Sequence, residues 1–434
     1  MSMQGRLNIF QRAMLLWNDL HPYNAVHTVE VPAALDTERL GNILNHALES
    51  HGLTGLILDR NAKTYHYGGG PSAEQIAMVP AGQDASMALV DEIQRQLNTA
   101  FVLDQSTTPF RFFVIEAQTS FYFGISYFHM VAGAESLVLL MQDLVNTFLD
   151  RDERGLSPPV NLYPTTYGPW LRRHPGILLR KVANLPSLFW QLKRSWRPRY
   201  SDEMNTDIGF DLFSLSASQL EQLKSTGKSW GITLNDLFLA FMLKIFAPLT
   251  DHRAFSSSRN RLSIGTIVNI RKDLKVDSRR TFGLFLGSFV VTHAVPEGIS
   301  LKQLAEDVNR QTSHIKRTRR YMGTPLDLAS SIRSLSMLST ERKKKFYQKH
   351  YPLWGGLTNM NLNTTWPQSN QTKPVNYFRA VSTGPATPLV LSITTVQDRV
   401  NISISFRTTV FSKADIEYVK SEFLSLLQHL MDNP

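Results

Sequence analysis

The stretch FYFGISYFHMVAGAESLVLLMQDL, residues 121–144, carries the strongest structural signal in the chain. Its first part is rich in aromatic residues, which favours a strand. From Ala134 onward, apolar residues recur at spacings of three and four, which predicts an amphipathic helix. His129 lies in the turn between them, where a rigid element can hold it at a cleft. Imidazole suits general-base chemistry near neutral pH, although a lone histidine is more often structural, so these residues alone leave both interpretations open.

Strand and helix signals alternate on both sides of this stretch. N-terminal to it, the sequence predicts a strand at 25–31, a helix opened by Asp36, a helix at 86–100 and a strand at 110–116. After residue 205 it predicts strands at 210–215, 262–270, 287–293, 389–396 and 400–408, the last two joined as a hairpin. Helices are expected at 216–226, 233–246, 301–319 and 412–430. Because regular βαβ units are missing, we expect two α/β lobes rather than a Rossmann fold or a TIM barrel.

The composition excludes several classes of protein. The chain has 434 residues, of which 42% are hydrophobic and 19% charged, as in globular proteins. The absence of cysteine excludes a disulfide framework, a thiolate metal site and a cysteine nucleophile. The sequence shows no membrane-spanning apolar stretch and no signal peptide. We therefore expect a cytoplasmic protein, free or peripheral on the inner face of a membrane, that is monomeric and holds no metal or bound cofactor.

The formal charge of +10 is concentrated in two segments. Residues 155–200 contain eight Lys and Arg and no acidic residue, and residues 301–350 contain twelve against four, so the two carry +16 and the remainder −6. The chain shows no zinc-finger spacing, RNP-like motif or basic zipper, so we expect no nucleic-acid binding. An anionic membrane, the phosphates of a nucleotide and an acidic carrier protein are the alternative partners, beside a merely solvated basic face.

The first basic segment also shows a helical pattern. One helix face would carry Leu178, Val182, Leu185, Phe189, Leu192 and Trp196. A helix with Trp, Leu and Phe on one side and Lys and Arg on the other can lie in a membrane interface. The alternative is a linker helix packed on the body with a solvated basic face, and Pro186 is expected to interrupt the helix. The candidate membrane or partner surface comprises Trp190, Lys193, Arg194 and Trp196.

The segment around His129 resembles the His-His-x-x-x-Asp-Gly region of the chloramphenicol-acetyltransferase-like superfamily. That group includes nonribosomal peptide condensation domains, wax ester synthases, polyketide-associated acyltransferases and plant BAHD acyltransferases. Aligned on the motif, Phe128 takes the first His position and His129 the second, catalytic one, while Gly133 and Ala134 take the Asp-Gly positions. HPYN at 21–24, GITLND at 231–236 and VNIR at 268–271 are similar to other family segments, in the same order. Two asparagines fall where a family strand crosses near the active site, Asn359 and Asn361.

The resemblance implies a fold class and a division of the chain. It implies two chloramphenicol-acetyltransferase-like α/β lobes, with mixed sheets, flanking helices and an active-site tunnel between the lobes. The N-terminal lobe with the His motif would span 1–160, a basic Trp-rich linker 161–205, and the C-terminal lobe 206–434.

The resemblance also implies an acyl transfer. A thioester donor, acyl-CoA or phosphopantetheine on an acyl carrier protein, would enter from one side, and a hydroxyl or amine acceptor, a small molecule or a lipid, from the other. His129 would remove the acceptor's proton as general base. The oxyanion that forms needs hydrogen-bond donors, for which Ser288, Ser392 and the backbone around Gly133 are candidates.

Two departures from the family pattern leave alternatives open. The family's motif Asp pairs with an Arg and shapes the His loop, which Gly133 cannot do. Either another residue, such as Glu135, supports the loop, or the partner is absent as well. Gly133 and Ala134 would also leave room beside His129 for a bulky acyl chain. The leading hypothesis is an acyltransferase that forms an ester or amide; the alternative is an altered or inactive relative that serves as a carrier-protein or lipid-binding adaptor.

Overall fold

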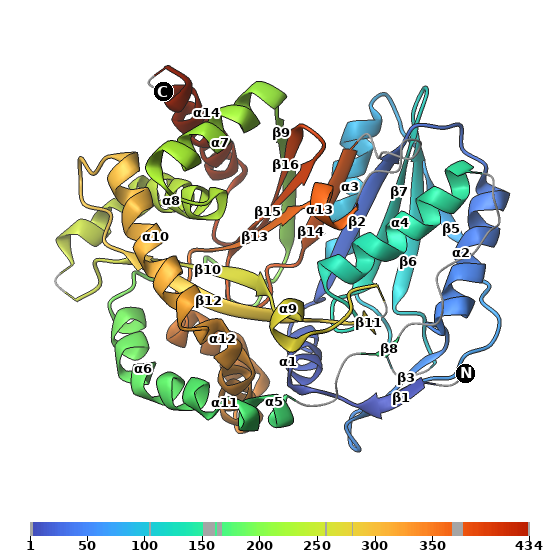
Figure 1. Ribbon diagram of the computed structural model, residues 1–434, viewed down its shortest axis with the longest axis horizontal. Coiled ribbons are helices and arrows are strands. Elements are labelled where there is room, and N and C mark those ends of the chain that lie inside the picture. Colours follow the sequence, from blue (N-terminus) through green and yellow to red (C-terminus); the bar gives the residue numbers. More distant parts are fainter. Residues whose placement is uncertain are drawn as a thin grey trace.

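The computed structural model describes residues 3–103, 106–150, 161–162, 167–256, 258–279, 281–366 and 376–432. Two large sheets, each covered by helices, organise the chain (Figure 1). The Pro-marked connection expected at 158–175 lies partly outside the described residues.

The first sheet has the strand order β14-β2-β7-β6-β5. Its strands are β2 (Asn24–Val31), β5 (Ile76–Val79), β6 (Phe110–Glu116), β7 (Phe121–Phe128) and β14 (Asn376–Val381). The helices on its two faces are α2 (Thr37–His51), α3 (Ala85–Asn98) and α4 (Ala134–Asp150) (Figure 1). Strand β7 is central and buried along its whole length. Gly124 is needed there because a Cβ atom would lie 2.1 Å from the Phe113 ring of β6.

The second sheet has the order β12-β10-β13-β15-β16-β9. Its strands are β9 (Ile208–Leu215), β10 (Leu262–Asn269), β12 (Leu286–His293), β13 (Gly355–Asn361), β15 (Leu389–Val396) and β16 (Arg399–Arg407). Helices α7 (Ala217–Trp230), α8 (Leu234–Phe246), α10 (Leu301–Arg317) and α14 (Lys413–Asp432) gather on one side of it (Figure 1). Helix α8 is buried on nearly all sides, as its continuous apolar sequence predicts.

Smaller elements complete the described chain. Strands β1 (Met3–Arg6), β4 (Thr64–Tyr67) and β3 (Leu56–Asp59) form a three-stranded sheet, and β8 (Asn161–Leu162) pairs with β11 (Thr281–Phe282). The remaining helices are α1 (Ile9–Asn18), α5 (Gly168–Arg173), α6 (Pro175–Lys193), α9 (Arg271–Leu274), α11 (Thr324–Ser336), α12 (Thr340–His350) and α13 (Leu362–Thr365), with 3-10 turns at Pro248–Phe255 and Arg320–Gly323. Among the described residues no single helix is long and apolar enough to cross a bilayer; α7 and α8 meet that criterion only as a pair, bent by 100°.

Local signals predicted the element starts correctly. The Asp36 side chain accepts a hydrogen bond from the Arg39 N–H, and Ser216 with Gln219 forms a capping box at the start of α7. The predicted hairpin is present, with Gln397 in the left-handed region at a φ of 52°. Two predictions for the linker helix were wrong: Pro186 does not interrupt it, because α6 continues through that residue to Lys193, and Trp196 lies beyond its end.

One strand crosses the predicted division of the chain at residue 206. Strand β14, at 376–381, lies in the assigned C-terminal lobe but pairs antiparallel with β2 in the first sheet. The chain therefore returns from the second sheet to complete the first, and helices α1 and α11, from distant parts of the chain, also pack together. Apart from this strand, the boundaries at 160 and 206 remain predictions.

Candidate active site

A cavity of about 1110 Å³ lies between the two large sheets. Tyr23, His129 and Gly133 line it from the side of the first sheet, and strands β10, β12, β13 and β15 line it from the other. Helix α6 closes part of the cavity wall with Lys181. The volume exceeds that of ordinary small-ligand pockets, so it accommodates two substrates or one long one.

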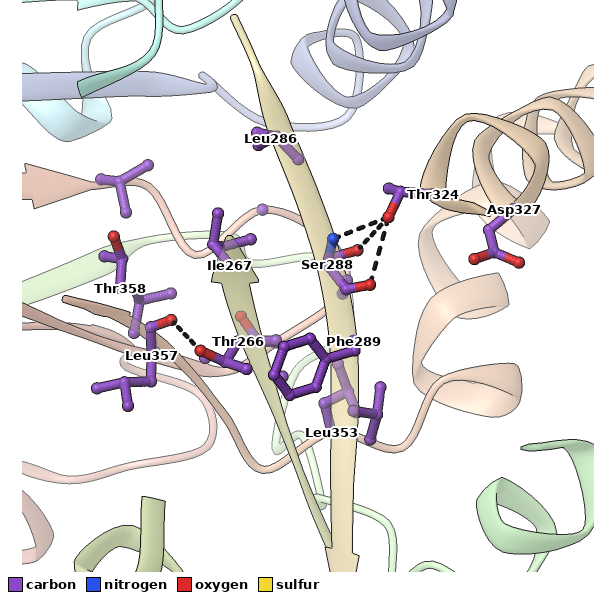
Figure 2. Close-up of a pocket in the computed structure, with 18 of the residues that line it drawn as sticks. Thr266, Ile267, Leu286, Ser288, Phe289, Thr324, Asp327, Leu353, Leu357 and Thr358 are labelled. Atoms are coloured by element: carbon purple, nitrogen blue, oxygen red, sulfur yellow. Dashed lines mark hydrogen bonds between the residues drawn. The ribbon is translucent and has the colours of Figure 1, made fainter. Parts of the chain in front are cut away.

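Figure 2 shows the second-sheet wall of this cavity, where β10 and β12 run side by side. Ser288 of β12 faces Thr324 at the start of α11: the Ser288 N–H donates to Thr324 Oγ1 at 2.8 Å, and the two hydroxyl oxygens are 3.4 Å apart. Asp327, one turn further along α11, forms an ion pair with Lys181 of α6. Ser288 therefore lines the cavity, and among the described residues its hydroxyl has only a long hydrogen bond to another side chain, that of Thr324.

His129 is held in one orientation by its own turn. Its Nδ1 lies 3.0 Å from the Ala132 carbonyl oxygen. A carbonyl can only accept, so Nδ1 carries the proton and Nε2 carries the lone pair. The His129 N–H donates to the Tyr23 carbonyl at 3.1 Å, and the Tyr23 ring stacks on the imidazole with centroids 5.5 Å apart. This arrangement presents a neutral imidazole that can take up a proton.

Burial sets the protonation state of this imidazole. It lowers the pKa of His129 to about 4, because the surrounding side chains exclude the water that would solvate an imidazolium, and the hydrogen bond to Ala132 offsets only part of that effect. The histidine is therefore in its base form throughout the physiological pH range.

The lowered pKa predicts an unusual pH profile. If His129 acts as the base, kcat/KM with a thioester donor should stay nearly constant between pH 7.5 and 5.5, as measured by initial rates of thiol release. A histidine with the ordinary pKa of about 6.5 would be roughly 90% protonated at pH 5.5 and would lose about tenfold in rate. A tenfold fall over that interval would contradict the assignment.

Folding stability must be measured over the same interval as a control. Burial lowers the pKa of His21 to about 3, and that of His27 well below its usual value, so both are neutral in the folded chain. Unfolded histidines take up protons near pH 6.5, so the stability contributed by these buried groups is complete above that pH and declines as the pH falls toward the folded-state values. Circular dichroism melts at each pH separate this loss from a change in rate.

The loop that carries His129 is tied to the second half of the chain by Arg271. One guanidinium nitrogen of Arg271 donates to Ser136 Oγ at 2.5 Å and another to the Thr281 carbonyl at 2.8 Å. Ser136 in turn donates to the Gly283 carbonyl and accepts from the Gly283 N–H, both at 3.1 Å. Glu135 Oε2 lies 3.7 Å from Arg271 Nε. Arg271, Ser136 and Glu135 thus form a cross-link between the start of α4 and the segment after β10.

The same cross-link bears on the missing motif aspartate. Glu135 also accepts a hydrogen bond from Asn269. Of the two alternatives raised by Gly133, the structure contains the one with a carboxylate beside an arginine, two positions further along. Gly133 itself donates its N–H to the Gly283 carbonyl at 3.0 Å. A Cβ atom at Gly133 would meet Leu284 at 3.4 Å and the Gly283 carbonyl at 3.7 Å, which is ordinary van der Waals contact, so Gly133 lines the cavity but leaves little free space beside it.

The other predicted residues fall into two groups. The cavity is lined, beside His129, by Ala134, Asn359 and Asn361. The Asn361 side chain also caps α13 by accepting a hydrogen bond from the Asn363 N–H. Phe128 does not line the cavity: the ring is fully buried and lies 6.4 Å from Phe101. The first position of the family motif is therefore part of the hydrophobic core in this chain.

The predicted surface on the linker is only partly exposed. Trp190 and Lys193 are exposed, but Arg194 is half-buried, 3.1 Å from Asn260. Trp196 is also half-buried, and its carbonyl accepts from the Trp354 indole at 3.1 Å. Arg194 lies over the Trp190 ring at 4.7 Å, so these two residues are neighbours, and the role of the four residues as a membrane or partner surface stays a prediction.

Sequence reasoning missed a polar group beneath the histidine. His27 Nδ1 lies 2.7 Å from the Tyr377 hydroxyl, and the Tyr127 ring stands edge-on to both His27 and His129. Arg379 of β14 donates to Thr394 Oγ1 at 2.9 Å and to the Ile393 carbonyl at 2.6 Å, which ties the first sheet to the second. Only the pairing of β14 with β2 brings these residues together, so no local pattern could have indicated them.

Comparison with known proteins settles the family. The condensation-domain profile matches residues 1–434. The chain belongs to the condensation-domain family. A search of curated proteins finds no significant match. The expected chloramphenicol-acetyltransferase-like α/β architecture is confirmed.

Solved structures of condensation domains share the fold. The first condensation domain of the calcium-dependent antibiotic synthetase, in complex with a substrate analogue, has a TM-score of 0.74 at 16% identity, covering 100% of this chain and 98% of that one. The cyclization-docking bidomain of EpoB from Sorangium cellulosum has a TM-score of 0.71 at 13% identity, with coverages of 100% and 85%. A variant starter condensation domain of rhizomide synthetase, in complex with C8-CoA and Leu-SNAC, has 0.69 at 13%, with coverages of 99% and 95%.

Condensation domains are acyltransferase-type enzymes that transfer acyl or peptidyl groups between substrates carried on phosphopantetheine. The prediction of a transferase of this general type is confirmed at that level. The donor, the acceptor and the role of His129 belong to the proposal that follows.

Proposed function

We propose that this condensation domain is an active acyltransferase in which His129 is the general base. The observation that carries the proposal is the hydrogen bond from Nδ1 to the Ala132 carbonyl, which leaves the Nε2 lone pair at a cavity lined from both sheets. The donor is an acyl thioester of an acyl carrier protein or of CoA, and the acceptor is a hydroxyl or amine on a small molecule or a lipid. The chain acts in the cytoplasm.

The residues support a direct transfer. The acceptor's oxygen or nitrogen attacks the thioester carbonyl carbon while its proton passes to Nε2 of His129. The carbonyl oxygen becomes an oxyanion, for which the Ser288 hydroxyl is the candidate donor because its hydrogen bond to Thr324 Oγ1 is long, at 3.4 Å. When the carbon–sulfur bond breaks, the departing thiolate takes the proton from His129. The products are an ester or amide and a free thiol, and no covalent enzyme intermediate is needed.

The Arg271 cross-link supports an intact site. A base must be held within hydrogen-bond reach of the proton it removes, and the His129 turn is fixed on one side by Tyr23 and on the other through Gly133, Ser136 and Arg271. The second candidate function is an adaptor that binds a carrier protein or lipid without turnover. It is supported by the absence of the family residues at positions 128 and 133.

An assay with two donor types tests the proposal. The full chain is supplied with the same acyl group on CoA and on an acyl carrier protein, together with panels of alcohols and amines, and products are identified by mass spectrometry. We expect acceptor-dependent release of thiol in equal amount to the ester or amide formed, with the preferred donor and acceptor giving the larger kcat/KM. Thiol release that never exceeds the protein-free rate with any donor and acceptor would favour the adaptor.

A further inference from the structure

Helix α6 presents its apolar side chains to the outside. Four large residues on its outer side are exposed: Leu179 (70%), Val182 (57%), Phe189 (69%) and Trp190 (51%). Their spacings of three, four and seven place them on one helix face together with the exposed Ala183 and Pro186. The outer face of α6 is therefore an uninterrupted apolar stripe.

The inner face of the same helix is mixed. Lys181, Asn184 and Gln191 line the cavity together with Leu185, Leu188 and Leu192, and Lys181 pairs with Asp327 of α11. A surface helix of a globular protein normally directs its apolar side chains toward the core, whereas α6 carries apolar side chains on both faces. An exposed apolar stripe of this kind is typical of a surface that binds a membrane or another apolar surface.

Basic residues surround the stripe. The exposed cations on and next to α6 are Arg172, Arg173, Arg180, Lys193 and Arg199. Residues 155–200 contain no Asp or Glu. Arg194 lies over the Trp190 ring at 4.7 Å, which holds that indole at the boundary between the apolar stripe and the basic residues. In Figure 1, α6 runs along the outer edge of the molecule, with the rest of the chain on one side of it.

From this arrangement we infer that α6 is an interfacial helix that docks the protein on an anionic phospholipid bilayer. The stripe of Leu, Val, Phe and Trp enters the boundary between headgroups and acyl chains, and the flanking Arg and Lys contact lipid phosphates. Exposed positive charge, in a stretch of sequence that contains no acidic residue, complements an anionic lipid surface. A bilayer fits better than a protein partner because the stripe has no polar side chain over about three turns, whereas non-obligate protein interfaces are about as polar as the rest of the surface.

The docked orientation has a consequence for the substrate, which rests on the proposed acyltransferase function. The inner face of α6 lines the cavity, so docking brings the cavity wall next to the bilayer. An acceptor or donor with a lipid tail can then pass from the membrane to His129 without crossing water. Membrane binding does not require acyl transfer, so an experiment that disproves the docking leaves the proposed acyltransferase function intact, and the reverse also holds.

Vesicle flotation tests the docking. The full chain is mixed with vesicles of phosphatidylcholine alone or of phosphatidylcholine with phosphatidylglycerol, and the floated fraction is measured. We expect flotation with the anionic vesicles and little with the neutral ones. The triple variant Leu179→Ser, Phe189→Ser, Trp190→Ser should reduce the bound fraction at least about tenfold, since it removes most of the apolar area that would enter the bilayer. Its melting temperature should be unchanged because these side chains are exposed.

A matched control separates the stripe from general hydrophobicity. Phe255 and Met337 are 89% and 83% exposed and lie outside α6, so Phe255→Ser with Met337→Ser makes a similar change elsewhere on the surface. This control should float like the unmodified chain. The inference is overturned if the unmodified chain floats with neither vesicle type, if the control loses binding as strongly as the triple variant, or if the triple variant still floats fully. Binding of an acidic carrier protein to α6 in place of vesicles would likewise overturn it.

Discussion

Replacing His129 with alanine should lower the rate of acyl transfer by about 10²–10⁴-fold, the usual contribution of a positioned general base. The loss should appear mainly in kcat, because the imidazole occupies little of a cavity of about 1110 Å³ and substrates bind chiefly to the rest of its wall. The measurement is single-turnover formation of ester or amide from the preferred thioester. An equal rate with and without His129 would remove the enzyme hypothesis and leave the adaptor.

Two further variants make this result interpretable. His129→Gln can still donate to the Ala132 carbonyl but cannot act as a base, so it should be as slow as His129→Ala while keeping the turn intact. His46→Ala removes an exposed histidine from α2 and should leave the rate unchanged. If His129→Gln were active and only His129→Ala were slow, the histidine would be structural rather than catalytic.

Replacing Arg271 with alanine should have the second-largest effect, on stability and rate together. The side chain is buried and contacts Ser136, the Thr281 carbonyl and Glu135. Its loss removes the guanidinium donor of the Thr281 carbonyl and one of the partners of Ser136 and of Glu135, and it leaves a cavity in the cross-link. We expect a loss of about 3 kcal/mol in the free energy of unfolding. Because the His129 turn loses its support, kcat should also fall, by about tenfold or more.

Urea unfolding and kcat measurements on the same preparations check this prediction. Arg271→Lys keeps the charge but not the planar fork that reaches two acceptors, so it should recover only part of the stability. Arg60→Ala is the matched control: Arg60 pairs with Asp19 at 2.7 Å, but both side chains are nearly half exposed, and the cost should stay below about 1 kcal/mol. Arg271→Ala with unchanged stability and rate would show that the cross-link does not support the loop.

Much of the fold was predictable because the relevant signals are local. The strand ending at Phe128, the turn with His129 and the helix from Ala134 follow from periodicities of two and of three to four residues in one short stretch. Helix starts at Asp36 and Ser216 follow from side chains that bond to backbone N–H groups three residues away. The order of such segments was enough to indicate the family, which the profile match over the whole chain confirms.

Helices α11 and α12 escaped prediction for a related reason. Their sequences have weak apolar periodicity, and α12 contains the run Arg342-Lys343-Lys344-Lys345 of the second basic segment, whose sequence indicates a solvated helix end or a docking segment. Packing of α11 against α1, from a distant part of the chain, lies beyond the reach of a local pattern.

The sequence by itself determined the position of the candidate base, the alternation of strands and helices, and the concentration of positive charge in two segments. Only the tertiary structure decided that Glu135 and Ser136 meet Arg271, which is 135 residues from Ser136. It also decided that the apolar stripe of α6 faces outward and that β14 completes the first sheet. The physical reason is the same in each case. Periodicity shows that a helix has an apolar face, and composition shows that a segment is charged. Which surface packs on that face, and which side chain pairs with each charge, depends on contacts between segments far apart in the chain.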